Sequence, residues 1–73
     1  MKCEIIEIRE KFIRLDALLK FSGAAQTGGQ AKIMISEGNV RVNGVPCEVR
    51  GKKLYNGDEV AADGGLYKIE SLL

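Results

Sequence analysis

The sequence contains no histidine, no tryptophan, one proline and two cysteines among its 73 residues. Without histidine, the chain lacks the commonest general base and the commonest metal ligand of proteins. Two cysteines cannot complete a structural zinc site, which takes four Cys or His ligands, and a small disulfide-built domain usually carries at least four. We therefore expect no enzyme activity, metal or cofactor, and we expect Cys3 and Cys47 to be reduced, small apolar packing residues.

Long hydrophobic runs are also missing, since no segment approaches the roughly 18 apolar residues that a membrane span needs. The opening segment MKCEIIEIREKF is charged throughout, unlike a signal peptide. Both features predict a cytoplasmic protein with no membrane partner. The length allows one domain, residues 1–73, which would bury about 60% of the surface of the unfolded chain and leave little room for a deep active site.

The whole chain has almost no net charge, but single segments carry an excess of one sign. The chain has 11 basic and 10 acidic residues, for a formal net charge of +1. Residues 14–53 carry a net charge of +4, whereas residues 54–73 carry −3. The near-neutral total argues against a nucleic-acid partner, but the basic middle segment is compatible with one.

Two short helices are predicted in the first half of the chain. Leu15, Leu18 and Leu19 recur at helical spacing within residues 14–21, and Gly23 follows as a C-terminal stop. A second helix is predicted over residues 28–37, with Ala31, Met34 and Ile35 on its apolar face and Lys32 directed to solvent. Thr27 and Gln30 have the spacing of a capping box at its start.

Strands are predicted on both sides of this helical pair. Residues 3–8 form the first strand, and residues 9–12 read as a polar connection. Asn43-Gly44 between valines is typical of a type I′ hairpin, and Pro46 predicts that the following strand lies at a sheet edge or is bulged there. After a basic connection at residues 50–54, turns at 56–57 and 63–65 separate two further strands. The order β-α-α-β-β-β-β predicts an α+β fold with two short antiparallel helices on a small, bent, mostly antiparallel sheet.

Several groups of residues could bind a ligand, and each also has a purely structural explanation. The TGGQAK helix start offers free backbone N–H groups to an anion, but the two glycines could also make a tight connection. The basic residues of the middle segment could follow phosphates or serve only solubility. Asn43 could contact a ligand or only shape its turn. Phe12 and Phe21 are expected to pack beside the first helix, so no base stacking is expected. The crowded carboxylates of Asp58, Glu59 and Asp63 are expected to be solvated.

Residues 13–62 together resemble the RNA-binding domain named after small-subunit ribosomal protein four, the S4 (S-four) domain. The motifs are the Arg-Leu-Asp segment at 14–16, Ala31-Lys32, Glu37-Gly38, Val40-x-Val42-Asn43-Gly44 and Gly57-Asp58. The segments SGAAQTGGQAK and RGKKL are similar to those of the small stand-alone bacterial members. The resemblance implies two helices on a small bent sheet, and a non-catalytic protein that binds structured RNA.

The resemblance also implies which residues contact RNA. They lie at the starts of the two helices, on the solvent face of the second helix, in the hairpin and in the basic loop: Arg14, Thr27, Gly28, Gly29, Gln30, Lys32, Arg41, Asn43, Arg50, Lys52 and Lys53. The chain departs from the family pattern at two places. Many members have Ser-Arg in place of Thr27-Gly28 and arginine in place of Lys32, so one cation and one bidentate phosphate ligand are lost.

The expected partner is structured RNA, with ribosomal RNA or a ribosomal subunit favoured by the stand-alone subgroup, and with a role in ribosome assembly or maturation. The chain is expected to be a monomer. The alternative is a protein-interaction module that docks a partner through the acidic tail or an exposed sheet edge.

Overall fold

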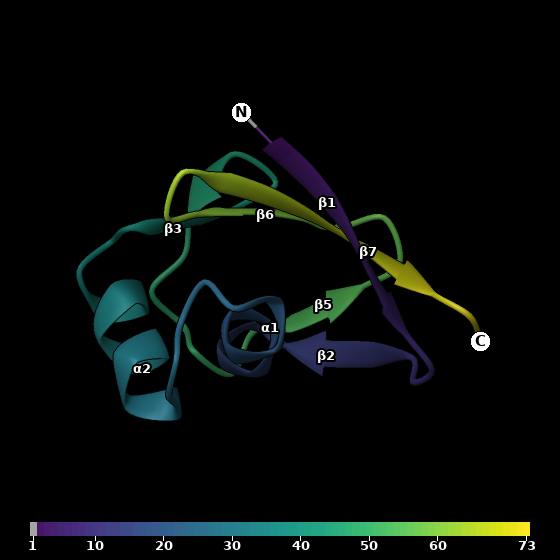
Figure 1. Cartoon of the computed structure of the whole chain (residues 1–73), viewed down its shortest axis with the longest axis horizontal. Helices are drawn as coiled ribbons and strands as arrows, with labels where there is room; N and C mark the ends of the chain where they lie inside the picture. The colour runs from purple at the N-terminus through teal and green to yellow at the C-terminus, as the bar shows by residue number, and fades with distance from the viewer. Residues whose placement is uncertain (1) are drawn as a thin grey trace.

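The computed structural model describes residues 2–73, which form two helices, a five-stranded sheet and a two-stranded sheet (Figure 1). In chain order the elements are β1 (Lys2–Ile8), β2 (Phe12–Arg14), α1 (Leu15–Ser22), α2 (Gly28–Ser36), β3 (Val40–Val42), β4 (Val45–Pro46), β5 (Lys53–Tyr55), β6 (Glu59–Ala62) and β7 (Gly65–Ser71). In Figure 1 the larger sheet lies above, and α1, α2 and the β2–β5 pair lie below it.

The larger sheet has the strand order β1-β7-β6-β3-β4. Its inner pairs β7–β6 and β6–β3 and the edge pair β3–β4 are antiparallel, whereas β1 runs parallel to β7 from Lys2↔Gly65 to Ile8↔Ser71. The predicted α+β fold with a mostly antiparallel sheet is therefore confirmed. The parallel pairing joins the first strand of the chain to its last.

The predicted turns are present, and their backbone explains the sequence. Asn43 and Gly44 have φ values of 51° and 83°, so both central positions of the β3–β4 turn are left-handed, as a type I′ turn requires. Asp63 and Gly64 repeat this pattern between β6 and β7, with φ values of 50° and 76°. Pro46 ends β4, which lies at the edge of the sheet, as predicted.

Both helices bury the faces that their spacing predicts. Leu15, Leu18 and Leu19 of α1 are fully buried, and α1 ends at Gly23 with a left-handed φ of 86°. In α2, Ala31 and Ile35 are buried, Met34 is partly buried and Lys32 is exposed. These leucines and small residues form the core together with inward-facing residues of the sheet, among them Ile6, Val40, Val60 and Ile69.

The start of α2 differs from the predicted capping box in one contact. Thr27 Oγ1 accepts a hydrogen bond from the Gln30 N–H at 3.1 Å, as expected for an N-cap. The reciprocal bond does not return to Thr27: Gln30 Oε1 accepts from the Gln26 N–H at 2.7 Å. The long glutamine side chain therefore reaches one residue further back and fixes the loop before the helix.

The structure adds two strands where the sequence suggested connections. Phe12–Arg14 pairs antiparallel with Lys53–Tyr55, which places Ile13 opposite Leu54. Three residues are too few to show a period of two, so the pattern alone did not reveal β2 and β5. Leu54 is fully buried and Ile13 packs against the core, so this small sheet closes the bottom of the core.

Three expected core residues lie at the surface instead. Phe12 and Phe21 are 38% and 67% exposed, so the expectation that they pack as core residues is wrong. Cys3 is exposed on β1, whereas Cys47 is half-buried against the core, and both are free thiols. Phe21 follows Leu15 by six residues, which places it about 120° around the helix from Leu15 and at the margin of the leucine face. Strand alternation directs Phe12 away from Ile13. Within residues 2–73, neither helix is long and apolar enough to cross a membrane.

Candidate nucleic-acid interface

The basic loop at residues 50–53 is fixed to the start of α1 by two backbone hydrogen bonds. The N–H of Leu15 donates to the carbonyl oxygen of Lys52 at 2.8 Å, and that of Asp16 donates to the carbonyl of Arg50 at 3.1 Å. Arg14 occupies the N-cap position without a side-chain cap bond. Loop carbonyls therefore accept from the free N–H groups of the first turn, which a capping side chain would otherwise satisfy.

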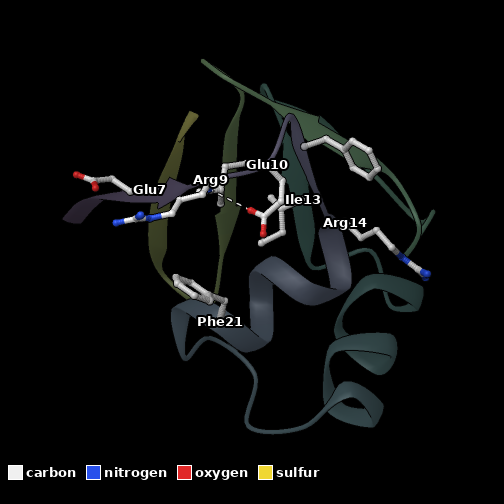
Figure 2. Close-up of a pocket in the computed structure, with 8 residues that line it drawn as sticks. Glu7, Arg9, Glu10, Ile13, Arg14 and Phe21 are labelled. Carbon is white, nitrogen blue, oxygen red and sulfur yellow. Dashed lines mark hydrogen bonds between the residues drawn. The ribbon is translucent and has the colours of Figure 1, made fainter. Parts of the chain in front are cut away.

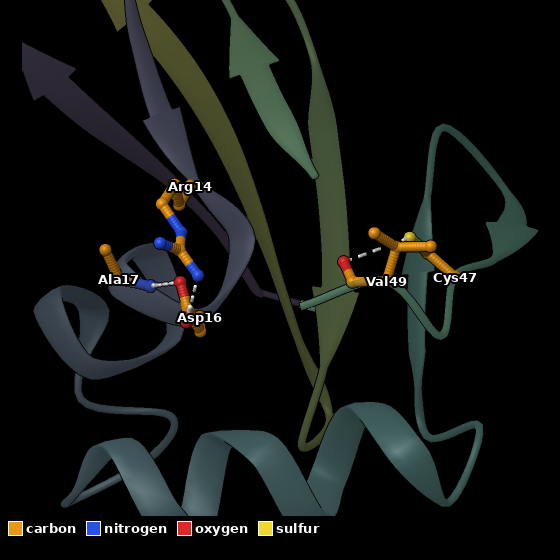
Figure 3. Close-up of polar contacts among 5 residues, drawn as sticks. All are labelled: Arg14, Asp16, Ala17, Cys47 and Val49. Carbon is orange, nitrogen blue, oxygen red and sulfur yellow. Dashed lines mark hydrogen bonds and ion pairs between the residues drawn. The ribbon is translucent and has the colours of Figure 1, made fainter. Parts of the chain in front are cut away.

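Arg14 lies where β2, α1 and this loop meet. Its strand partner is Lys53, and its Nη2 atom is 3.1 Å from the Asp16 carboxylate in an exposed ion pair (Figure 3). The guanidinium also lies over Gly51, because a Cβ added there would be 3.6 Å from Nη2. Half of the Arg14 side chain remains exposed, so part of its charge faces solvent beside Lys52 and Lys53.

A shallow hollow connects this corner to the start of α2. It is lined by Arg14, Asp16, Ala17, Lys20 and Gly28. Lys32 is exposed one helical turn after Gly28 and therefore lies on the same face of α2. Lys20 belongs to the basic middle segment, but the residues that the family resemblance implies did not include it. Its spacing of one turn from Asp16 already places it off the leucine face.

Glycine is not required by packing at the start of α2. A Cβ added to Gly28 would meet no heavy atom within 4 Å, and one added to Gly29 would meet only Thr27 Oγ1 at 3.9 Å. Neither residue has a left-handed backbone. A tight connection therefore does not explain this glycine pair. The two residues leave the first N–H groups of α2 open to close approach by an anion.

These residues define what we call the basic surface. It combines the open backbone at the start of α2 with cations from both helices, from the N-cap of α1 and from the 50–53 loop: Arg14, Lys20, Gly28, Gly29, Lys32, Arg50, Lys52 and Lys53. Asp16 is the acidic residue among them, and it is paired to Arg14. The surface therefore carries a large local excess of positive charge on a chain whose total charge is +1.

Asn43 and Lys52 line a second hollow, beside the β3–β4 hairpin. The Asn43 Nδ2 atom donates to Asp58 Oδ1 at 3.1 Å, and its Oδ1 atom accepts from the Glu59 N–H at 2.9 Å. Asp58 in turn accepts from the Tyr55 N–H at 2.7 Å. Asn43 and Asp58 thus connect the hairpin to the turn after β5, and both ends of the Asn43 amide are occupied within the protein.

Cys47 lies in the same hollow, where its thiol is 3.8 Å from the carbonyl oxygen of Val49 (Figure 3). Val45 and Val49 add exposed apolar surface beside Lys52. The hollow is therefore a mixed apolar and polar surface, in contrast to the cationic hollow between the helices.

Arg41 lies apart from the other residues implied by the resemblance. Val40 and Val42 point into the core, so Arg41 projects from the opposite, outer face of the sheet. It lines a hollow with Asp63 at the β6–β7 turn. The register places Lys68 on the same outer face together with three acidic residues, Glu7, Glu59 and Glu70. The acidic residues around Arg41 therefore offset its positive charge.

A further hollow lies between β1, β2 and the end of α1 (Figure 2). Ile13 and Phe21 contribute apolar surface, and the positive charges of Arg9 and Arg14 balance the negative charges of Glu7 and Glu10. Figure 2 shows the Arg14 side chain directed away from Arg9, Glu10 and Phe21. This hollow therefore adjoins the basic surface at Arg14, but the charges of its lining residues balance.

Comparison with known proteins identifies the family of the chain. The S4 domain family matches residues 6–70. The chain belongs to the S4 domain family. The match extends the expected core of residues 13–62 in both directions and includes the last three residues of β1 and most of β7, the strands that pair in parallel.

Two S4-like proteins illustrate the similarity. The probable ribosome maturation protein RlbA of Bacillus subtilis (strain 168) is 44% identical over 59 residues, which cover 81% of this chain and 83% of that protein. The solution structure of YbcJ from E. coli matches with a TM-score of 0.68 at 30% identity, covering 97% of this chain and 89% of that one. YbcJ is described as having an ALFAL motif involved in RNA-binding.

Proposed function

We propose that this protein is a non-catalytic, cytoplasmic RNA-binding protein that uses the basic surface to hold structured RNA. The observation that carries the proposal is the convergence of Arg14, Lys20 and Gly28 in one hollow, with the 50–53 loop hydrogen-bonded beside it. Membership of the S4 domain family and the description of YbcJ support RNA as the partner.

The geometry suggests recognition of the phosphate backbone rather than of base edges in a helix. The cations lie on the ends of helices and in a short loop, and the hollow between the helices is shallow. Paired RNA hides its major-groove base edges, so a surface of this kind would contact phosphates and 2′-hydroxyl groups. The open N–H groups at Gly28 and Gly29 would add donors to a phosphate oxygen.

The proposed RNA is ribosomal RNA, and the proposed role is in ribosome maturation. The similarity to RlbA, over most of both chains, supports this choice. Copurification with ribosomal particles from cells, followed by crosslinking and sequencing of the bound RNA, tests it. Recovery of transfer RNA instead would leave the basic surface intact as an RNA-binding site but would contradict the ribosomal role.

Charge reversal on the basic surface tests RNA binding directly. We expect Lys20→Glu combined with Lys32→Glu to weaken binding to a labelled stem-loop RNA and to make the slope of log K against log salt less negative by about two, since each lysine would lose one phosphate contact. A matched control combines Arg41→Glu with Lys68→Glu, which changes the net charge equally on the outer face of the sheet.

The control variant should retain both affinity and salt slope if binding depends on location and not on net charge. Equal losses of RNA affinity in the two variants would show that binding depends only on the net charge of the protein. Circular dichroism and thermal unfolding confirm that both variants are folded, because all four side chains are exposed.

The protein-interaction alternative has support at one edge of the larger sheet, the seven-residue strand β1, and less elsewhere. In the acidic tail, the Asp58 carboxylate already accepts hydrogen bonds from the Tyr55 N–H and from the Asn43 amide. The edge strand β4 is two residues long and ends in proline. Ribonuclease treatment separates the two functions. A native complex that survives the treatment would favour a protein partner.

A further inference from the structure

The small β2–β5 sheet presents two aromatic rings to solvent beside two cations. Ile13 and Leu54 point into the core, so their neighbours Phe12, Arg14, Lys53 and Tyr55 share the outer face. Phe12 and Tyr55 are direct partners, with ring centroids 5.9 Å apart and planes tilted by 48°. Phe12 is 38% exposed and Tyr55 49% exposed.

Lys53 distinguishes the two rings. Its Nζ atom lies 4.8 Å from the centroid of the Phe12 ring, so a cation already covers one face of that ring. Among the cations whose side chains the structure describes, none covers the Tyr55 ring in this way. Tyr55 is also the more exposed residue of the two. The open ring therefore lies next to a lysine whose charge can reach a neighbouring phosphate.

This aromatic patch continues the basic surface. Arg14 belongs to both, because it lines the hollow between the helices and is also the strand partner of Lys53. A phosphate chain bound at the start of α2 could therefore pass Arg14 and Lys53 and reach Tyr55. RNA that follows this path would place a base beside the Tyr55 ring.

We propose that one unpaired RNA base stacks on Tyr55, with its flanking phosphates held by Lys53 and Arg14. The inference rests on the proposed RNA-binding function and adds a substrate preference to it: RNA with an unpaired base next to a stem. Base stacking on exposed aromatic rings is tolerant of base identity, since every base has a π-face.

Two RNA probes separate stacking from phosphate binding. One is a stem-loop with unpaired loop bases, and the other is a blunt duplex of the same stem sequence. We expect Tyr55→Leu to weaken binding of the stem-loop by about tenfold and to leave binding of the duplex unchanged. Tyr55→Phe, the matched control, retains the ring and should bind both probes as the unaltered protein does.

Fluorescence provides a second measurement that needs no change at Tyr55. The chain has two tyrosines and no tryptophan, so Tyr67→Phe leaves Tyr55 as its one tyrosine fluorophore. Tyr67 is partly buried and the substitution removes only its hydroxyl group. We expect the stem-loop to quench Tyr55 emission strongly, because a stacked base contacts the ring, and the duplex to quench it weakly.

The results separate this inference from the function on which it rests. Stem-loop binding that depends on Lys20 and Lys32 but is unaffected by Tyr55→Leu, with no quenching, would overturn the stacking site alone. Failure of the unaltered protein to bind either RNA would overturn both proposals. Equal weakening of both probes by Tyr55→Leu would also contradict stacking, since it would indicate only a structural role for the cross-strand ring pair.

Discussion

At the scale of single residues, the structure separates side chains that support the fold from side chains available to a ligand. Asn43 belongs to the first group, because its amide bonds to Asp58 and to the Glu59 N–H and its φ of 51° shapes the turn. Gly28 belongs to the second, because nothing in the protein requires its missing side chain. Family resemblance alone gave both residues the same role.

Gly28→Ala should separate stability from binding. The added methyl group meets no atom within 4 Å, and reduced freedom of the unfolded chain should stabilise the protein by about 0.4–1 kcal/mol. The same methyl group should weaken RNA binding, because it obstructs approach to the first N–H groups of α2. Denaturant unfolding and a binding titration measure the two effects. Weaker binding without added stability would point to a disturbed helix start instead.

Asn43→Ala should affect stability and not binding. It removes two hydrogen bonds and places a non-glycine, non-asparagine residue at a left-handed φ, so we expect a loss of about 1–3 kcal/mol in the free energy of unfolding. RNA affinity of the folded protein should change little. Asn43→Gly, which tolerates the backbone but lacks the amide, isolates the contribution of the side chain. A large loss of RNA affinity in a fully folded variant would indicate that Asn43 contacts RNA.

At the scale of elements, periodic segments were predicted well and short ones were not. The leucine face of α1, the apolar face of α2 and the Asn-Gly hairpin all follow from local spacing and turn chemistry. The strands β2 and β5 have three residues each, and their pairing depends on Ile13 and Leu54 meeting across a long stretch of chain. No local pattern records such a contact, so the exposed face of this small sheet could not be anticipated.

The N-cap of α2 provides a test at this scale. Thr27→Ala removes the acceptor for the Gln30 N–H and should lower stability by about 0.5–2 kcal/mol, whereas Thr27→Ser should preserve most of it. Thermal unfolding measures both. Because the start of α2 forms part of the basic surface, RNA affinity of Thr27→Ala should fall as well. Unchanged stability would mean that the Gln26–Gln30 contact is sufficient to hold this helix start.

At the scale of the whole molecule, the fold sorts charges that are mixed along the chain. Cations from the two helices and one loop meet on the side away from the outer face of the sheet. On that outer face, acidic residues outnumber Arg41 and Lys68. The net charge of each chain segment indicated a basic middle and an acidic tail. The segment charges could not show that Arg41 lies away from the basic surface, because its position depends on the face of β3 from which it projects.

Salt dependence is the corresponding prediction for the whole molecule. Neutralising about four to six phosphates should give a slope of log K against log salt of roughly −3 to −5. Titration of a stem-loop RNA at several salt concentrations measures the slope. A value near zero would contradict binding through phosphates, whatever the affinity at one salt concentration.

The parallel pairing of β1 with β7 has a consequence for how the chain acquires its structure. β1 contacts β7 and no other strand of the sheet, so it has no partner in the sheet until the residues of β7 are available. Closing such a long loop costs entropy before any pairing energy is gained, which slows folding relative to a local hairpin. During synthesis, the helices and the β3–β4 hairpin can therefore form on a growing chain, whereas completion of the sheet must wait for the C-terminal strand.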